Sequence, residues 1–265
     1  MELKDKVAVI TGGASGMGKA TAKRFIKHGA KCALFDINQD RGKALADELG
    51  ASAIFCRVDI VDEESVRAGI TRTLETFGAI HINTNYAGTG NAIRTVGKSG
   101  PFPLKEFKFI IEVNLVGTFN VLRLCAQEMA KNVPVNDDGA RGVIINTASA
   151  AAYEGQIGQA AYSASKGGIV GMTVPIARDL ASLGIRVNTI VPGLFATPMF
   201  MAGHEQQTDE IRAYMEQGPL KQTLFPRRLG EPDEIAKLAQ ALVENDYINS
   251  ECIRIDSGMR MPPKF

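Results

Sequence analysis

Short hydrophobic segments alternate along this chain with longer segments in which hydrophobic residues recur every three or four positions. The short segments predict strands at 7–10, 31–35, 53–58, 80–84, 142–146, 185–191 and 252–255. The longer segments predict helices at 17–28, 40–49, 63–77, 104–131, 160–183 and 232–243. Strands that alternate with helices are joined by right-handed crossovers into a parallel sheet with helices on its faces. The pattern therefore predicts an α/β fold, a Rossmann-type doubly wound parallel sheet of about seven strands.

Three segments interrupt this alternation. Residues 88–103 and 132–141 are rich in loop-forming residues and predict loops. Residues 195–226 mix large hydrophobic side chains with polar ones, and a connection of that length in a compact domain is often an active-site lid. The hydrophobic members of this expected lid are Leu194, Phe195, Met199, Phe200, Met201 and Phe225. Nothing resembles a linker, so we expect residues 1–265 to form a single domain.

The charge balance excludes partners that need clustered charge. The 265 residues carry 30 Lys and Arg against 29 Asp and Glu, a net charge of +1, so we expect no nucleic-acid or membrane partner. The polar start of the chain and the short hydrophobic segment at 7–10 favour a cytoplasmic protein. Four scattered cysteines and three histidines show no metal-ligand spacing, so we predict neither a metal site nor disulfides.

A glycine-rich turn follows the first predicted strand. The segment Thr11–Gly18 reads T-G-G-A-S-G-M-G and leads directly into a predicted helix. Glycines let the backbone approach phosphates, and the helix N-terminus offers free N–H groups. A purely structural turn is the alternative interpretation.

Asp36 sharpens the expectation of a dinucleotide. It stands 18 residues after Gly18, at the end of the second predicted strand, where a carboxylate accepts ribose hydroxyls. The carboxylate would repel a 2′-phosphate, and Ala14 and Ile37 stand where a compensating cation could be, so we predict NAD over NADP. Arg41 and Lys43 remain possible phosphate partners, and a helix N-cap is the alternative role for Asp36.

Two further strand ends carry candidate cofactor contacts. Asp59 could meet the adenine amino group, or it could cap the helix that begins near Asp62, and the sequence does not decide between these roles. The tetrad Asn85–Gly88 reads N-Y-A-G, and its small residues would let the backbone lie against the nicotinamide ribose.

A serine, a tyrosine and a lysine form the candidate catalytic group. Ser149 follows the fifth predicted strand, and Tyr162 and Lys166 are four residues apart, on one face of a predicted helix. An ammonium near a phenol should lower the pKa of Tyr162 and prepare it as a general acid and base. Ser149 can hold the substrate oxygen, and Asn114 is a candidate to hold a water. Singly, each residue could be an ordinary surface or core side chain.

Taken together, these motifs resemble the short-chain dehydrogenase/reductase family over the whole chain. They are the T-G-x-x-x-G-x-G turn, Asp36, Asn85–Gly88, Asn114, Ser149, Tyr162, Lys166, and Pro192-Gly193 before Thr197. Residues 141–149, 154–172 and 192–195 resemble a branch of that family that oxidises 3-hydroxyacyl-CoA. The resemblance implies that Ser149 polarises the carbonyl, Tyr162 transfers its proton, Lys166 contacts the nicotinamide ribose and Asn114 completes the relay.

The motifs and the resemblance also imply a set of binding residues. The expected NAD contacts are Gly12, Ser15, Met17, Gly18, Asp36, Asp59, Ile60, Asn85, Tyr86, Gly88, Tyr162, Lys166, Phe195 and Thr197. Gln159, with Ser149 and Tyr162, should face the substrate. Tyr86 departs from the small or amide residue usual in the family, which puts the local fit around adenosine in question. The resemblance implies a homotetramer that uses the helices at 104–131 and 160–183.

The function we expect is NAD-dependent interconversion of an apolar secondary alcohol and its ketone. The resemblance points to oxidation of 3-hydroxyacyl-CoA to 3-oxoacyl-CoA, an activity of lipid metabolism. A hydroxysteroid or another cyclic alcohol is the alternative substrate. Lys221, Arg227 and Arg228 could bind CoA phosphates or form a solvated basic face. A non-catalytic dinucleotide-binding scaffold is the alternative of a different class.

Overall fold

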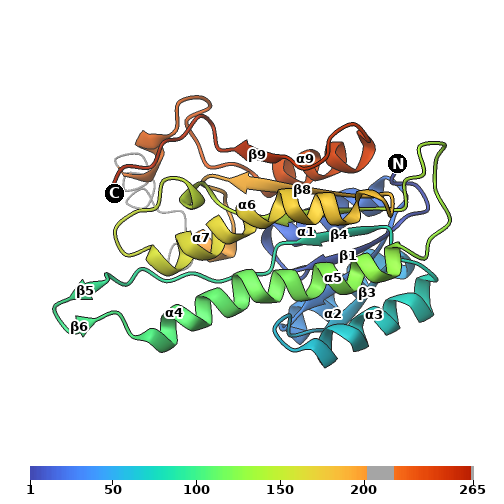
Figure 1. Cartoon of the computed structure of the whole chain (residues 1–265), viewed down its shortest axis with the longest axis horizontal. Coiled ribbons are helices and arrows are strands. Elements are labelled where there is room, and N and C mark those ends of the chain that lie inside the picture. Colours follow the sequence, from blue (N-terminus) through green and yellow to red (C-terminus); the bar gives the residue numbers. More distant parts are fainter. Residues whose placement is uncertain (202–217, 264–265) are drawn as a thin grey trace.

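A computed structural model describes residues 1–201 and 218–263 of the chain. Within these residues, seven strands form one parallel sheet in the order β3-β2-β1-β4-β7-β8-β9 (Figure 1). The strands are β1 (Val7–Thr11), β2 (Lys31–Asp36), β3 (Ala53–Arg57), β4 (Ile82–Asn85), β7 (Gly142–Thr147), β8 (Ile185–Pro192) and β9 (Cys252–Ile255). All seven predicted strands are confirmed, and with them the doubly wound α/β fold of a single domain.

Helices cover both faces of the sheet. One face packs against α1 (Gly16–Lys27), α2 (Gln39–Leu49) and α9 (Pro232–Glu244), and the other against α3 (Glu63–Phe77), α5 (Gly117–Met129) and α6 (Ala160–Ala181). Alternate residues of each strand point to opposite faces of the sheet. Ile10 and Leu34 belong to the hydrophobic core on the side of α1, and Val9 and Phe35 to the core on the side of α3. Continuous burial on both faces explains why these strands are uninterrupted hydrophobic runs.

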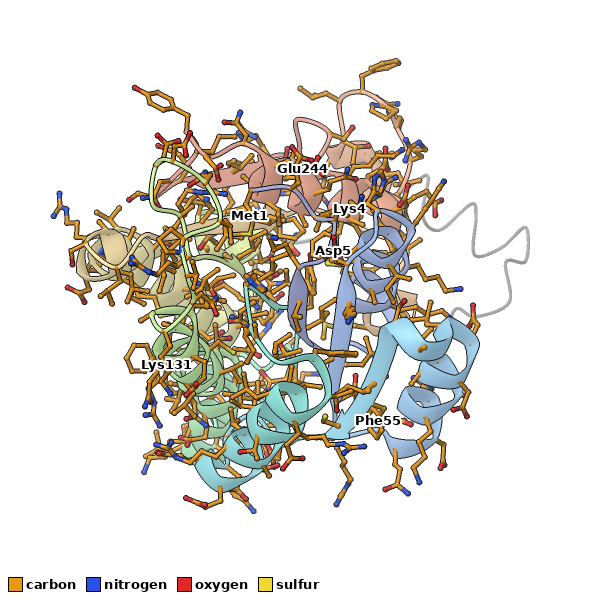
Figure 2. All side chains as sticks on the ribbon, turned by 90° about the vertical axis from the view of Figure 1, so that its right-hand side faces the viewer. Met1, Lys4, Asp5, Phe55, Lys131 and Glu244 are labelled. Atoms are coloured by element: carbon orange, nitrogen blue, oxygen red, sulfur yellow. The ribbon has the colours of Figure 1, made fainter. Side chains whose placement is uncertain are left out.

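Close packing extends to the edge of the sheet at β3. Phe55 lies against α2, where its ring leaves no room for a side chain at position 42. A Cβ on Gly42 would lie 2.1 Å from the ring carbon Cε2 of Phe55. By contrast, Lys4, Asp5 and Lys131 carry their charges at the surface of the molecule, as expected for solvated groups (Figure 2).

The predicted helix at 104–131 is one continuous helix with a π-helical turn inside it. It comprises α4 (Leu104–Ile111), a π-helical turn η2 (Glu112–Val116) and α5. This stretch, Leu104–Met129, is the one helix among the described residues that is long and apolar enough to cross a membrane. In its most apolar window, 56% of the residues are buried inside the molecule, and a helix of a protein core meets the same criterion.

The three irregular segments have different structures. Residues 88–103 contain a hairpin of two short strands, β5 (Val96–Gly97) and β6 (Gly100–Pro101), which extends away from the sheet (Figure 1). The expected lid contains α7 (Pro198–Met201) and the 3-10 turn η4 (Pro219–Gln222). The remainder of that segment, 202–217, lies outside the described residues.

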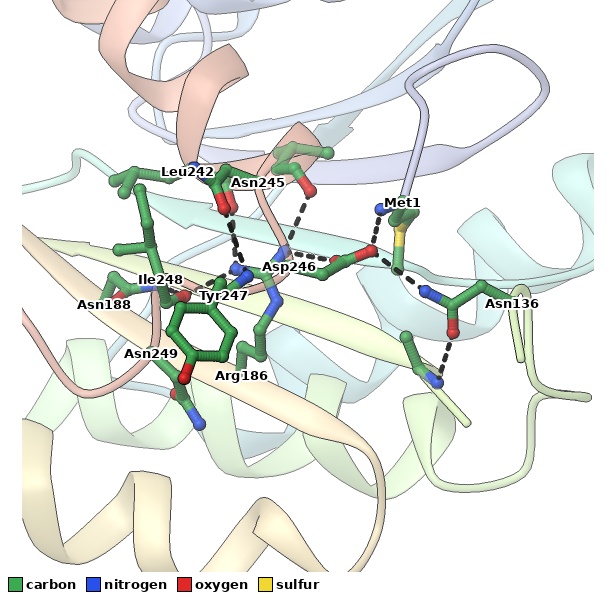
Figure 3. Close-up of polar contacts among 12 residues, drawn as sticks. Met1, Asn136, Arg186, Asn188, Leu242, Asn245, Asp246, Tyr247, Ile248 and Asn249 are labelled. Atoms are coloured by element: carbon green, nitrogen blue, oxygen red, sulfur yellow. Dashed lines mark hydrogen bonds and ion pairs between the residues drawn. The ribbon is translucent and has the colours of Figure 1, made fainter. Parts of the chain in front are cut away.

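The loop at 132–141 is fastened by a polar network. Its Asn136 donates to the carboxylate of Asp246, which also pairs with the amino group of Met1 and with Arg186 on β8 (Figure 3). The buried guanidinium of Arg186 donates in addition to the carbonyl oxygens of Leu242 and Ile248. The network ties the loop and the end of α9 to the amino-terminal edge of the sheet, remote from the candidate site.

Candidate active site

A cavity of about 670 Å³ lies at the carboxyl ends of the central strands. Its lining includes these predicted site residues: Gly12, Ser15, Met17, Gly18, Asp36, Asp59, Ile60, Tyr86, Gly88, Ser149, Tyr162, Lys166, Phe195 and Thr197. Ligands of open α/β sheets bind at this edge, where the strand order reverses. The fold therefore brings together residues that are up to 185 positions apart in the chain.

The glycine turn forms a tight backbone cradle at one wall of the cavity. A Cβ on Gly18 would lie 2.3 Å from the carbonyl oxygen of Gly12, so no side chain fits there. Gly12 has a φ of +63°, which favours glycine. Ser15 precedes α1 without capping it through its side chain, and Ser15, Gly16 and Met17 line the cavity. The first turn of α1 thus presents its N–H groups to the cavity, as a phosphate requires.

Asp36, at the end of β2, holds the glycine turn in place through its side chain. Its carboxylate accepts hydrogen bonds from the backbone N–H groups of Ala14, at 3.1 Å, and Asn38, at 2.9 Å. Asn38 is the residue that caps α2, since its side chain accepts from the N–H of Arg41. The alternative that Asp36 caps that helix is therefore wrong. Its carboxylate lines the cavity, where a ribose can reach it.

The structure also separates the two roles considered for Asp59. Asp62 caps α3 by accepting from the N–H groups of Glu64 and Ser65. The carboxylate of Asp59 accepts only from the N–H of Val61 among the contacts described, and Asp59 lines the cavity. Helix capping is thus excluded for Asp59, whereas its contact with adenine stays a prediction. Apolar side chains that include Ile60, Phe109 and Val113 complete this part of the wall.

Two residues of the N-Y-A-G tetrad take unexpected positions. The hydroxyl of Tyr86 accepts a hydrogen bond from Thr21 of α1 at 2.9 Å, and its ring packs with the core beneath α1. The fold thus accommodates the unusual tyrosine, while Tyr86 still lines the cavity. Asn85 is buried below the cavity and donates to Asn83 at 2.7 Å and to Asn146 at 2.9 Å. The Asn85 side chain thus joins neighbouring strands, and the contact of Asn85 with the cofactor stays a prediction.

The candidate catalytic residues meet between β7 and α6. Ser149 begins the 3-10 turn η3 (Ala150–Ala152), and its Oγ accepts from the N–H of Ala151 at 3.1 Å. Tyr162 lies in the first turn of α6, and Lys166 one turn later. The Nζ of Lys166 lies 5.8 Å from the centre of the Tyr162 ring and donates to the carbonyl oxygen of Thr147 at 2.8 Å.

Burial governs the protonation of both residues. Burial raises the pKa of Tyr162, and a hydrogen bond with Ser149 lowers it by less. Burial lowers the pKa of Lys166 to about 8. That Lys166 lowers the pKa of Tyr162 therefore stays a prediction. With a pKa of about 8, Lys166 stays largely protonated at neutral pH and keeps its positive charge beside the ring of Tyr162.

Asn114 lies in the π-helical turn and fastens the segment above the catalytic residues. Its Oδ1 accepts from the N–H of Thr89 at 2.8 Å, and its Nδ2 donates to the carbonyl of Thr89 and to Ser165. A Cβ on the adjacent Gly88 would lie 3.1 Å from Asn114 Oδ1 and 3.6 Å from Lys166 Nζ. The side chain is therefore fully paired with protein groups, and its expected water-holding role stays a prediction.

Gln159 does not line the main cavity. Its side-chain oxygen accepts from the N–H of Gln156, and it borders a second cavity of about 620 Å³ with residues 94–96 and 155–160. The prediction that Gln159 faces the reacting substrate is not supported by this position. Thr147, by contrast, was not predicted: it lines the main cavity with a buried hydroxyl that has no partner in the described structure. Its position two residues before Ser149, at the end of the same strand, is the signal that could have identified it.

Metal chemistry finds no support among residues 1–201 and 218–263. No group of three or more His, Cys, Asp or Glu side chains there could hold an ion. The four cysteines are free thiols, three of them buried. Of the three cations considered for CoA phosphates, Arg228 pairs with Glu234 at 2.8 Å, whereas Lys221 and Arg227 are exposed.

The lining of the main cavity suits a nicotinamide dinucleotide. The glycine cradle has room for a pyrophosphate, and the carboxylate of Asp36 can bind the hydroxyls of a ribose. The apolar wall near Ile60 can pack against a flat base. At the opposite end of the cavity, the hydroxyl of Thr147, which has no partner in the described structure, and the buried ammonium of Lys166 offer hydrogen bonds to the nicotinamide half of the dinucleotide.

Comparison with known proteins agrees with this geometry. The family model described as short chain dehydrogenase matches residues 6–208. The chain is 50% identical to 3-hydroxyacyl-CoA dehydrogenase type-2 of Bos taurus over 98% of its own length and 97% of that protein. The crystal structure of the type-2 enzyme from Mycobacterium avium covers 100% of both chains, with a TM-score of 0.90 and 39% identity.

A structure solved with NADH is also similar. It is the 3-ketoacyl-(acyl-carrier-protein) reductase of Brucella melitensis, with a TM-score of 0.81 and 30% identity over 97% of this chain and 98% of the other. The family match and the near-complete coverage agree with the glycine cradle and the Ser149, Tyr162 and Lys166 group. This chain belongs to the short-chain dehydrogenase/reductase family and is an oxidoreductase that uses a nicotinamide dinucleotide.

Proposed function

We propose that this chain is an NAD-dependent dehydrogenase that interconverts 3-hydroxyacyl-CoA and 3-oxoacyl-CoA. The observation that carries the proposal is the single cavity that joins the glycine cradle and Asp36 to Ser149, Tyr162 and Lys166. The relative from Bos taurus that bears the name of this activity is 50% identical over nearly the full length of both chains. A non-catalytic scaffold would not need the complete set of catalytic residues.

The chain's own residues supply orientation and proton transfer. Ser149 holds the substrate oxygen, and Tyr162 removes the hydroxyl proton during oxidation or returns it during reduction. Lys166 steadies the end of β7 through Thr147 and provides a positive charge beside the tyrosine. When bound, the nicotinamide ring accepts or supplies the hydride at the carbinol carbon.

The preference for NAD over NADP rests on Asp36. A 2′-phosphate would approach a carboxylate that the backbone N–H groups of Ala14 and Asn38 already hold in place. The next residue, Ile37, is 67% exposed and offers no cation. Like charges at close range in this partly closed cavity disfavour NADP.

The test compares initial rates of NADH formation with 3-hydroxybutyryl-CoA and with a 17β-hydroxysteroid, using Tyr162→Phe as the inactive control. We expect a clear preference for the CoA ester. Preference for the steroid would replace the substrate class but leave the reaction intact. Failure of both substrates, with NADH still bound, would favour the scaffold.

We further propose a homotetramer that buries exposed hydrophobic side chains of α5, η2 and α6. Val116, Phe119 and Val174 are 43%, 46% and 40% exposed on these elements. An exposed stripe of this kind on neighbouring helices suits an interface between copies of the chain. Sedimentation equilibrium tests this: a monomer mass near 28.4 kDa would contradict it. The cytoplasmic location stays a prediction.

A further inference from the structure

A segment late in the chain lies along the loop that connects Ser149 to Tyr162. We call residues 254–263 the C-terminal arm and residues 148–159 the catalytic loop. The backbone N–H of Ile157 donates to the carbonyl of Pro263 at 2.9 Å, and the side chain of Gln156 donates to the carbonyl of Pro262 at 3.0 Å. The arm thus supplies hydrogen bonds to a loop that has only one 3-10 turn of its own.

An ion pair joins the arm to the loop at its centre. Glu154 accepts from Arg254 at 2.9 Å and from the backbone N–H of Met261 at 2.8 Å. The two side chains are 22% and 25% exposed, so solvent screens this pair less than a surface pair. The hydrogen bond from Arg254 is the main reason that the pKa of Glu154 lies below its usual value.

Arg254 is itself held from several sides. It donates to Asp256 at 2.6 Å and to the carbonyl of Met259 at 2.9 Å, and its guanidinium lies 5.8 Å from the centre of the Tyr153 ring. A side chain with this many partners has one orientation. Arg254 can therefore hold the catalytic loop at a fixed position relative to β9.

The same arm touches the opposite wall of the cavity. The N–H of Gly193 donates to Ile255 at 3.0 Å, and a Cβ on Gly193 would lie 2.7 Å from the Cβ of Asp256. The N–H of Leu224 donates to the carbonyl of Ser257 at 2.9 Å. The arm therefore connects the catalytic loop with the Pro192-Gly193 wall and with the end of the expected lid.

We propose that Glu154 and Arg254 are a positioning pair, which fixes the catalytic loop so that Ser149 and Tyr162 reach the same substrate oxygen. Neither side chain lines the main cavity, so their effect passes through the loop. The proposal rests on the proposed function for its link to turnover, but the contacts of the loop with the arm are independent of the substrate.

The first experiment compares Glu154→Gln with Asp233→Asn, which removes an ion pair to Arg24 between α1 and α9 that does not contact the catalytic loop. We expect Glu154→Gln to lower kcat roughly ten- to a hundredfold, because small misplacements of reacting groups have effects of that size. NADH affinity, measured by fluorescence, should change less than about twofold. Asp233→Asn should leave kcat unchanged. An unchanged kcat in Glu154→Gln would overturn the proposal.

A double-mutant cycle with Ser149→Ala tests whether the pair acts through the serine. If it does, Glu154→Gln should cause little further loss of kcat in the Ser149→Ala background. Losses that multiply in full would overturn the proposal, since they would show that Glu154 acts independently of Ser149.

Hydrogen exchange separates this proposal from the substrate assignment, because it needs no turnover. Amides of residues 149–162 should exchange faster in Glu154→Gln than in the parent chain or in Asp233→Asn. Unchanged exchange there would refute the positioning role even if the substrate is correct. Faster exchange with no activity on either alcohol would instead refute the proposed function.

Discussion

Lys166 donates its side-chain hydrogen bond to the carbonyl oxygen of Thr147, at 2.8 Å, and thereby joins α6 to the end of β7. The bond comes from a buried ammonium group whose pKa is lowered to about 8 by its burial. One residue therefore has two effects: it supplies charge to the catalytic group, and its burial opposes folding while it is charged.

Replacing Lys166 by Met should separate these effects. We expect kcat to fall about 10²- to 10⁴-fold, the range typical of losing part of a general acid and base. The native pKa lies below the unfolded value of 10.5, so the unfolded chain binds more protons between pH 8 and 10.5. The parent should therefore gain stability relative to Lys166→Met as pH rises through that window. Urea unfolding at a series of pH values measures this, and a constant difference would contradict it.

Replacing Asp36 should change the choice of cofactor. We expect Asp36→Ser combined with Ile37→Arg to raise the ratio of kcat/KM for NADP to that for NAD by at least about a hundredfold, because a repulsion is removed and a cation is added. Asp40→Asn is the control, since that exposed carboxylate in the first turn of α2 does not line the cavity. A ratio that stays within a few-fold of the parent would remove the role given to Asp36.

Two helical glycines provide a matched pair of substitutions. In Gly18→Ala, the new Cβ would lie 2.3 Å from the carbonyl oxygen of Gly12, so the cradle must open and NADH affinity should fall at least tenfold. In Gly171→Ala, no atom outside the backbone of the helix itself lies within 4 Å of the new Cβ. The free energy of unfolding should therefore rise by about 0.5–1 kcal/mol. Fluorescence titration and urea unfolding measure the two effects. Equal NADH affinity in both variants would show that the turn does not hold the cofactor.

Protonation of the buried His81 ring should lower the stability of the protein in mild acid. Burial lowers its pKa to about 4, with a smaller contribution from Lys6, and its ring accepts from the N–H of Val7. Since the unfolded pKa is 6.5, the unfolded chain binds more protons between pH 6.5 and 4, and stability falls as pH decreases through that window. At about 1.4 kcal/mol per pKa unit the shift sets an upper limit of about 3.5 kcal/mol, and solvent screening of this partly exposed ring makes the loss smaller.

The measurement is urea unfolding of the parent and of His81→Gln at pH 7, 5.5 and 4.5. The variant should lose less stability than the parent on acidification, although it can start lower because the contact with Val7 changes. Parallel curves for the two proteins would exclude His81 as the source of the acid sensitivity.

The strands could be predicted from the sequence because burial on both faces leaves a local pattern. β1 and β7 contain only buried residues, so each is an uninterrupted short segment between polar turns. The glycine turn, Asp36 and the Tyr162–Lys166 spacing are local in the same sense. Their joint order along an alternating chain indicated the site before its geometry was known.

Features that depend on distant partners left no such pattern. The ion pair of Glu154 with Arg254 joins residues 100 positions apart, and Asn85 reaches Asn146 across 61 positions. The π-helical turn at Glu112–Val116 has the same hydrophobic spacing as the helices on either side of it. The position of Gln159 could not be predicted for a related reason: its contact with Gln156 and the cavity that it borders do not follow from its distance to Tyr162.

The C-terminal arm has a consequence for how the protein is made. The glycine cradle, Asp36 and the Ser149–Lys166 group are synthesised well before residues 254–263. The part of the chain that holds the dinucleotide can therefore fold first on the nascent chain. The loop between Ser149 and Tyr162 gains its contacts with the arm only when β9 has joined the sheet and Arg254 has reached Glu154. A chain interrupted before that point would present a formed nucleotide cradle beside an unfinished catalytic group, so the order of synthesis delays activity until the domain is whole.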